Sequence, residues 1–366
     1  KIYRARFRLL RKAYERSHIA EDPEFQRFKY ENSWWLRDYA VFMAVKGVFG
    51  GQEWTKWAED IRLRWNNAMD YYQREYYFDI EFQEYLQYQF IRQWRELKAY
   101  ANGKGIRIIG DIPIYVAMDS ADAWAHPELF QLDENNRPTA VAGCPPDGFS
   151  ASGQLWGNPL YRWDYHRQTG YQWWLQRLSY CYQLYDVVRI DHFRGFDEYY
   201  SIPFGDEDAT KGHWEKGPGM ELFRTVKAAL GEKEIIAEDL GYITDSVRRL
   251  VWESGYPGMK EFAFDSRDSG CASDYLPHNY PENSVAYTGT HDNETITGWY
   301  DSITEEERTL VRKYLCDMRT ARKNLYLPLI SLIMRSSARI CIIPMQDYLG
   351  LDNRCRMNTP STVGKN

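Results

Sequence analysis

The sequence predicts an α/β fold in which parallel strands alternate with helices, and two observations carry this prediction. From residue 106 onward, short apolar runs that end in polar residues are separated by helical stretches. This pattern is typical of parallel strands covered by helices. Residues 1–101 instead repeat apolar residues at spacings of three and four, as in "KIYRARFRLLRKAYER", and are predicted to be almost entirely helical.

Two glycine-containing segments mark predicted helix ends in the helical region. Gly50-Gly51 is predicted to separate one helical segment from the next. A long helix is predicted over 82–101, "FQEYLQYQFIRQWRELKAYA", and Gly103 and Gly105 suit its C-terminal cap.

Strands and helices alternate in the rest of the chain. The predicted strands are 106–116, 185–191, 234–241, 259–265, 284–293 and 338–347. The predicted helices are 168–184, 219–232, 244–254 and 304–336, the last opening with a Thr304–Glu307 capping box. A closed (β/α)8 barrel needs eight strands. The alternatives are therefore an open doubly wound sheet, or a barrel whose first two strands and last helix lie outside this chain.

Composition excludes several classes of partner. The 366 residues carry a net charge of −6 without a basic stripe, so no nucleic acid partner is predicted. The sequence shows no signal peptide and no long apolar span, so no membrane partner is predicted. Cysteines without metal-binding spacing, two of them (Cys181 and Cys341) in apolar surroundings, indicate a reduced, cytoplasmic protein. The 14 Trp, 29 Tyr and 16 Phe mostly form core, but a minority of such rings can serve as platforms for sugar rings.

Carboxylates end five of the predicted strands. They are Asp111, Asp191, the pair Glu238-Asp239, Asp265 and Asp292. A single acidic strand end is usually a helix N-cap or a loop salt bridge. The carboxyl ends of parallel barrel strands, however, all point to one face. Several acids converging there, with Arg189, His192 and His291 beside them, indicate a catalytic site.

Paired carboxylates beside a cation suit the cleavage of glycosidic bonds. One carboxylate attacks the anomeric carbon, and a second, kept protonated by its environment, protonates the leaving oxygen. Arg189 lies two residues before Asp191 on the same strand face and is expected to keep it ionised. The competing interpretation is a metal site that uses His192 and His291. No H-x-x-x-H or H-E-x-x-H spacing occurs, so no metal is predicted.

At these segments the sequence resembles a known family. "VVRIDHFRG", "IIAEDLG" and "YTGTHDN" resemble the three catalytic segments of the α-amylase clan. "GDIPIYVAMDSADAW", "PPDGFSASGQLWGNPLYRW", "WEKGPG" and "RMNTPSTVG" resemble, more narrowly, amylomaltases, the 4-α-glucanotransferases of glycoside hydrolase family 77. The resemblance is dense over 106–366 and looser before it.

The resemblance favours the barrel over the open doubly wound sheet. It implies a (β/α)8 TIM barrel with a large helical insertion, present here as a fragment lacking the first two strands and the last helix. The helical insertion subdomain is expected over 1–101. Residues 102–366 are expected to form the catalytic barrel strands 3–8, with a lid loop around 144–156.

The resemblance also implies roles. Asp191 matches the nucleophile, Glu238 the acid/base and Asp292 the transition-state stabiliser of a retaining double displacement. The implied substrate-binding residues are Arg189, His192, His291, Trp156, Asn158, Phe149, Asp111, Asp265 and Asn358. The expected partners are α-1,4-glucans and maltooligosaccharides, with no cofactor. Two alternatives stay open, an α-glucan hydrolase of the same clan and a catalytically inactive glucan-binding fragment.

Overall fold

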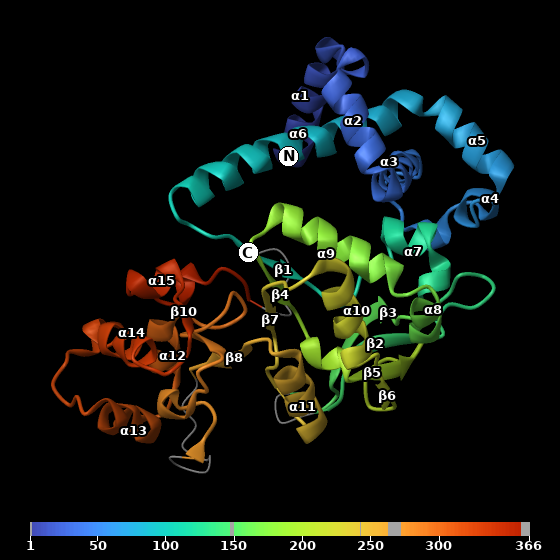
Figure 1. Ribbon diagram of the computed structural model, residues 1–366. Coiled ribbons are helices and arrows are strands. Elements are labelled where there is room, and N and C mark those ends of the chain that lie inside the picture. Colours follow the sequence, from blue (N-terminus) through green and yellow to red (C-terminus); the bar gives the residue numbers. More distant parts are fainter. Residues whose placement is uncertain (1, 147–149, 242, 263–271, 360–366) are drawn as a thin grey trace. The chain divides into compact units, whose positions relative to one another are not determined.

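The computed structural model divides the chain into two compact units (Figure 1). The described residues are 2–146, 150–241, 243–262 and 272–359. The first unit comprises residues 1–188 and 195–233, and the second comprises residues 189–194 and 234–366. The predicted boundary between 101 and 102 stays a prediction.

Residues 2–101 fold almost entirely as helices, as the sequence predicted. The predicted break at Gly50-Gly51 is confirmed, because α3 ends at Val48 and the two glycines have positive φ angles of 64° and 85°. The long predicted helix is α6, and α1, α2 and α3 lie against it (Figure 1). The helices of this region are α1 (Ile2–Ser17), α2 (Pro23–Glu31), α3 (Ser33–Val48), α4 (Glu59–Arg62), α5 (Asn66–Glu75) and α6 (Tyr77–Gly103).

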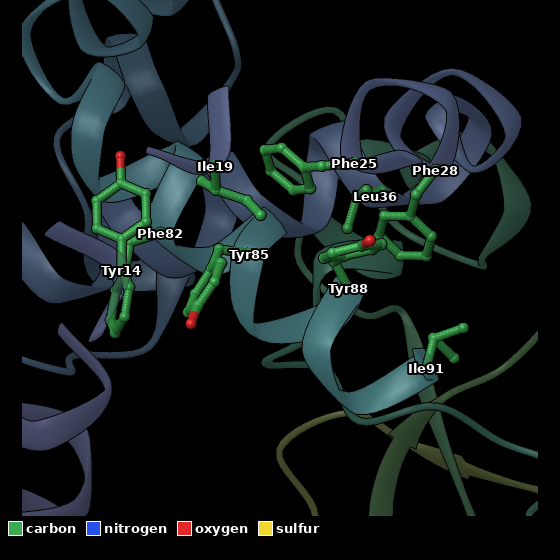
Figure 2. Packing of buried hydrophobic residues seen from close by; sticks show 9 residues of the cluster. All are labelled: Tyr14, Ile19, Phe25, Phe28, Leu36, Phe82, Tyr85, Tyr88 and Ile91. Atoms are coloured by element: carbon green, nitrogen blue, oxygen red, sulfur yellow. The ribbon is translucent and has the colours of Figure 1, made fainter. Parts of the chain in front are cut away.

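An aromatic core joins these helices (Figure 2). Phe82, Tyr85, Tyr88 and Ile91 of α6 belong to this core, and because they recur every three residues each is a neighbour of the next on the helix surface. The other members of this core come from the helices before α6 and are Tyr14, Ile19, Phe25, Phe28 and Leu36. Trp35 of α3 and Tyr180 of a later helix pack against it.

A four-stranded antiparallel sheet in the first unit was not predicted. Its order is β3-β2-β5-β6, and its strands are β2 (Ala140–Cys144), β3 (Gln154–Pro159), β5 (Glu198–Pro203) and β6 (His213–Lys216). β2 and β3 flank the segment predicted as a lid. A β-carbon on Gly143 would lie 2.1 Å from the backbone oxygen of Gln154, so the two strands approach closely there because this residue is glycine.

Within its described residues, the first unit has four further α-helices, of which the last two match predicted helices and the first two were not predicted. They are α7 (Ala121–Ala125), α8 (Trp163–Gln168), α9 (Gln172–Leu184) and α10 (Met220–Leu230). The helix predicted over 168–184 is divided at Thr169–Tyr171. Tyr171 adopts a left-handed φ of 57° directly before α9 begins.

Every predicted apolar run overlaps a strand of a six-stranded sheet. Its order is β1-β4-β7-β8-β9-β10, and its strands are β1 (Ile109–Ile112), β4 (Val187–Ile190), β7 (Ile235–Ala237), β8 (Gly258–Glu261), β9 (Ser284–Tyr287) and β10 (Ile340–Ile342). The last four strands pair in parallel, with Val285 opposite both Met259 and Ile340. Parallel pairing brings the carboxyl ends of these strands to one edge.

The helices of the second unit lie between these strands in the sequence or follow the last of them. They are α11 (Asp245–Ser254), α12 (Ile296–Ser302), α13 (Glu305–Leu315), α14 (Tyr326–Met334) and α15 (Met345–Tyr348). The Thr304–Glu307 capping box opens α13, as predicted. The helical stretch predicted over 304–336 is broken, because Cys316 adopts a left-handed φ of 53° and ends α13.

The fold is therefore α/β, as the sequence predicted, with parallel strands and intervening helices. Within the described ranges, no helix combines the length and apolar character that crossing a membrane requires.

Candidate active site

The carboxylate of Asp191 follows directly on β4 and is paired with a cation from the same strand. Arg189 Nη1 lies 3.1 Å from Asp191 Oδ1, and the two side chains are 13% and 44% exposed. Arg189 also directs its Nε–H to Met259 Sδ at 3.2 Å, which fixes the guanidinium beside β8. A neighbouring cation favours the ionised form of a carboxyl. Asp191 is thus an accessible, oriented carboxylate, as its position after the strand predicted.

Glu238 follows β7 and is held by two backbone N–H groups. Leu240 donates to its Oε1 at 2.8 Å, and His192 donates to its Oε2 at 2.7 Å. Burial and the negative charge of Asp191 raise the pKa of Glu238 to about 7, against the opposing effects of these N–H groups and of Arg189. A carboxyl with a pKa near neutrality can both donate and accept a proton during turnover.

His192 links the two acids through its backbone. Its φ of 52° lies in the left-handed region, which costs a non-glycine residue about 1–3 kcal/mol. Burial and the charge of Arg194 lower the pKa of the imidazole to about 3, so the ring is neutral at pH 7. A neutral imidazole adds no positive charge that would depress the pKa of Glu238.

Asp239, the neighbour of Glu238, has a structural role. Its Oδ1 accepts the N–H of Met259 at 2.7 Å and so joins the end of β7 to β8. A β-carbon on Gly258 would lie 2.6 Å from Asp239 Oδ2, so glycine is needed for this carboxylate to fit. Burial raises the pKa of Asp239 as well, so what separates it from Glu238 is that its side chain is committed to the sheet.

Glu261, the last residue of β8, is a further acid at this edge of the sheet. Its Oε2 accepts an N–H from Asn293 at 3.3 Å. Asn293 in turn accepts from the backbone N–H and the hydroxyl of Thr290 at 2.7 and 2.6 Å, closing the turn that carries His291 and Asp292. Burial raises the pKa of Glu261, and the charge of Asp292 raises it too, while Asn293, Thr290 and Arg189 lower it.

Asp292 contacts its sequence neighbour His291 and two residues that come much later in the chain. His291 Nε2 lies 3.3 Å from Asp292 Oδ2, and Asn358 Nδ2 donates to Asp292 Oδ1 at 2.6 Å. Arg356 also donates to the backbone oxygen of Asp292 at 2.9 Å. The predicted residues His291, Asp292 and Asn358 are thus brought together. The side chain of Asp292 remains 51% exposed and accessible to a substrate.

The described residues offer no group of three or more His, Cys, Asp or Glu side chains arranged to hold a metal ion. The strand-end acids instead accept hydrogen bonds from backbone N–H groups and side-chain amides or pair with an arginine. These donors are suited to orienting carboxyl groups for acid–base and nucleophilic chemistry.

Comparison with known proteins identifies the family to which these segments belong. The family model described as 4-alpha-glucanotransferase matches residues 1–366. A 4-alpha-glucanotransferase of Clostridium butyricum is 44% identical over 369 residues, which cover 100% of this chain and 75% of that protein. One from Thermus thermophilus is 46% identical over 359 residues, covering 96% of this chain and 71% of that protein. This chain belongs to the 4-α-glucanotransferase family.

A solved structure agrees with this assignment. The amylomaltase from Streptococcus agalactiae in complex with acarbose has a TM-score of 0.95 and 41% sequence identity, and the match covers 100% of this chain and 74% of that one. The resemblance to amylomaltases is therefore confirmed, and the chain is a glycosyltransferase rather than a hydrolase of the same clan.

The remaining residues expected to bind substrate in this 4-α-glucanotransferase lie elsewhere in the sequence. Asp111 is an exposed residue of β1. Trp156 lies on β3 and is 37% exposed, with Tyr115 at 6.3 Å between ring centroids. Asn158 donates its side-chain N–H to the backbone oxygen of Val116 at 2.8 Å, which ties β3 to the segment after β1. Phe149 and Asp265 lie outside the described residues.

The sequence analysis missed two residues of the 4-α-glucanotransferase site. Glu261 was passed over because the run "MKEFAFD" was taken to end at Asp265, whereas β8 ends at Glu261. A carboxylate two residues after the buried Met259 was the available signal. Arg356 stands in the segment "RMNTPSTVG", but its contact with Asp292 spans a long stretch of sequence and has no local signal.

Proposed function

We propose that the chain transfers maltooligosaccharide segments between α-1,4-glucans by a retaining double displacement. The observation that carries this proposal is the pairing of two unlike acids. Glu238 has a pKa raised to about 7, whereas Asp191 is exposed and paired with Arg189. Two carboxyl groups with different protonation states are what a retaining glycosidase-type mechanism requires.

In the first step, an Asp191 carboxylate oxygen attacks C1 of the donor sugar. The bond from C1 to the glycosidic oxygen breaks, and Glu238 gives its proton to that departing oxygen. The product is a β-glucosyl ester on Asp191 and a free 4-hydroxyl on the released chain. Asp292 stabilises the positive charge that develops on the sugar ring in the transition state.

The second step reverses the proton flow. Glu238, now ionised, takes the proton from the 4-hydroxyl of an acceptor chain, and the resulting oxygen attacks C1. The ester bond to Asp191 breaks, and two inversions restore the α configuration. The bond broken and the bond made are of one kind, so the reaction needs no cofactor or external energy source.

The other site residues bind or position the substrate in this proposal. Arg189 orients the nucleophile, His192 fixes Glu238 through its backbone N–H, and His291 and Asn358 hold Asp292. Further sugar contacts are assigned to Asp111, Phe149, Trp156, Asn158 and Asp265. The segment around 144–156 is proposed as a lid that excludes water and so favours a sugar acceptor.

The six strands are proposed to be strands 3–8 of a (β/α)8 barrel into which residues 1–101 are inserted. The parallel pairing of β7 to β10 and the acids at the strand ends support this arrangement. The proposed partners are α-1,4-glucans, and the amylomaltase of Streptococcus agalactiae was solved with acarbose. The cytoplasmic setting inferred from the cysteines stays a prediction.

Incubation with maltotriose tests the proposed function. A transferase converts it into a ladder of longer maltooligosaccharides together with glucose, and anion-exchange chromatography resolves these products. A hydrolase instead accumulates maltose and glucose without longer products. That second outcome would overturn the proposal, and a fully inert enzyme that is folded and binds maltoheptaose would favour the binding-fragment alternative.

A further inference from the structure

The loop that carries Asp292 is bonded at both ends to one buried side chain. This loop spans residues 288–296, from the end of β9 to the first residue of α12. Asp347 of α15 is 1% exposed. Its Oδ2 accepts a hydrogen bond from the hydroxyl of Thr288, and its Oδ1 accepts the N–H of Ile296 at 2.8 Å. The two oxygens of a single carboxyl group therefore hold the two ends of the loop, and all of these residues belong to the second unit.

The contacts of Asp347 are buried on both sides. Thr288 is 5% exposed and Ile296 is 2% exposed. Burial raises the pKa of Asp347, and its hydrogen bonds to Thr288 and Ile296 lower it. A polar side chain withdrawn from water costs free energy unless its atoms are hydrogen-bonded. The two contacts with the loop therefore offset the cost of burying this carboxyl group, and they give both ends of the loop one fixed partner.

Asn353, which follows α15, binds the same end of the loop as Asp347 Oδ1. Its Oδ1 accepts the N–H of Thr295 at 3.2 Å, and its Nδ2 donates to Glu294 Oε1 at 2.5 Å. A β-carbon on Gly298 would lie 2.0 Å from Asn353 Oδ1, so this approach to α12 requires glycine. The segment after β10 thus supplies two side chains that attach the loop to the fold.

Other contacts act within the loop. Asn293 closes a turn with Thr290, and Asn358 donates to Asp292 Oδ1. These contacts orient Asp292 relative to its neighbours, whereas Asp347 attaches the loop to the ends of β9 and α12. The position of Asp292 therefore depends on a residue that is bonded to the ends of its loop.

We propose that Asp347 is a positioning residue for the transfer reaction and acts through Asp292, by fixing the loop on which Asp292 is carried. This proposal rests on the proposed function, in which Asp292 stabilises the charge that develops on the sugar ring. Such stabilisation depends on groups that are held in place before the reaction. Misplacement by about 1 Å can cost about 10²-fold in rate. A residue that only stabilises the fold would instead lower stability without changing kcat per folded molecule.

Two substitutions of Asp347 separate these roles. Asp347→Ala removes both contacts with the loop. Asp347→Asn conserves volume, can still accept the N–H of Ile296, and presents an amide N–H that the hydroxyl of Thr288 can accept. With maltotriose, we expect kcat per folded molecule to fall about 30- to 100-fold in the alanine variant, with KM changed by less than about threefold. We expect the asparagine variant to stay within about fivefold of wild type. A folded asparagine variant as slow as the alanine variant would overturn the proposal.

Two controls account for lost stability and for the loss of a loop contact. Val311→Ala removes buried methyl groups from α13 and no hydrogen bond of the loop. Asp317→Ala removes a carboxylate that accepts the N–H groups of Arg319 and Thr320 at 3.0 and 2.9 Å, in a segment that carries no residue of the site. Both are expected to keep kcat per folded molecule within about twofold. A loss in Val311→Ala as large as in Asp347→Ala would show that destabilisation alone slows the reaction, against the proposal.

A double-mutant cycle tests whether Asp347 acts through Asp292. If it does, adding Asp347→Ala to the Asp292→Ala enzyme should lower kcat by less than about threefold, because the group that was positioned is already gone. The same 30- to 100-fold loss in both backgrounds would mean that Asp347 acts independently of Asp292, and the proposal would fail.

Amide hydrogen exchange measures the anchoring of the loop without any assay of activity. In Asp347→Ala, the amides of residues 288–296 should exchange at least about tenfold faster, while those of α13 keep their wild-type rates. Unchanged exchange in the loop would overturn the anchoring role of Asp347. Faster exchange together with full activity of Asp292→Ala would instead place the failure in the proposed function, because Asp292 would not be the stabilising group.

Discussion

Glu81 and Glu84 on α6, and Glu238 and Glu261 at the ends of β7 and β8, are two pairs of carboxyls withdrawn from water. On α6 the carboxylates are surrounded by hydrogen-bond donors and a cation. The hydroxyls of Tyr14 and Tyr77 donate to Glu81 at 2.8 and 3.0 Å. Lys29 lies 3.9 Å from Glu81 and 3.8 Å from Glu84.

At the strand ends the surroundings are different. Glu238 accepts hydrogen bonds from two backbone N–H groups, and the negative charge of Asp191 adds to the effect of burial in raising its pKa. Burial raises the pKa of Glu84 as well, but Lys29 and Arg37 lower it. The comparison teaches that burial of a carboxyl does not by itself make a catalytic acid. A second carboxylate raises the pKa of both acids, Glu81 that of Glu84 and Asp191 that of Glu238. What distinguishes Glu238 is the place of the cation, because Arg189 is paired with Asp191, whereas Lys29 and Arg37 both lie against Glu84 itself.

The largest effect is expected from Asp191→Ala, which removes the proposed nucleophile. Transferase kcat should fall by at least about 10⁴-fold, as for other enzymes that lose a nucleophile. The melting temperature should change by less than about 3 °C, because the Asp191 side chain is 44% exposed and leaves no core cavity. Maltotriose assays and thermal unfolding are run on one preparation. A large drop in melting temperature would show that Asp191 is a structural partner of Arg189 instead.

The pH dependence of kcat/KM tests the protonation state of Glu238. This carboxyl has a raised pKa of about 7, so it is protonated below that pH and loses its proton as the pH rises through it. Because the proposed first step needs the proton, kcat/KM should fall about tenfold per pH unit above that point. A maltotriose profile from pH 5 to 9 measures this. A flat alkaline limb would mean that Glu238 is not the acid.

The same comparison predicts that Glu84→Gln affects stability and leaves the chemistry intact. The variant leaves Lys29 and Arg37 without the charge of their shared partner, whose side chain is 7% exposed. The free energy of unfolding should fall by about 1–3 kcal/mol. Urea denaturation measures this, and kcat per folded molecule should stay within about twofold. A loss of kcat without a loss of stability would place the α6 pair in the catalytic machinery.

Glu261→Gln is expected to have the smallest effect, and this effect falls on catalysis and not on stability. The substitution conserves volume but removes the charge that faces Arg189 and weakens the acceptor for Asn293. We expect kcat/KM to fall about tenfold, corresponding to about 1.4 kcal/mol, with stability nearly unchanged. Glu253→Gln, an exposed position on α11, serves as the control. Wild-type kinetics with lowered stability would show that Glu261 supports the sheet and not the reaction.

Much of the architecture could be predicted because it depends on local sequence patterns. Each of the six apolar runs overlaps a strand, the break at Gly50-Gly51 lies where it was expected, and the Thr304–Glu307 box opens α13. These features depend on residues a few positions apart, which a single sequence displays. The antiparallel sheet escaped prediction because the pairing of β2 with β5 joins residues far apart in the sequence.

By itself, the sequence determined the family, the α/β class and the positions of Asp191, Glu238 and Asp292 after their strands. Strand periodicity and motif spacing are properties of neighbouring residues, so they needed no coordinates. Only the tertiary structure decided that Asp239 braces the sheet, that Glu261 accepts from Asn293 beside Asp292 and that Asn358 holds Asp292. It also decided the protonation of Glu238, because a pKa depends on burial and on charges that the fold brings together from distant parts of the chain.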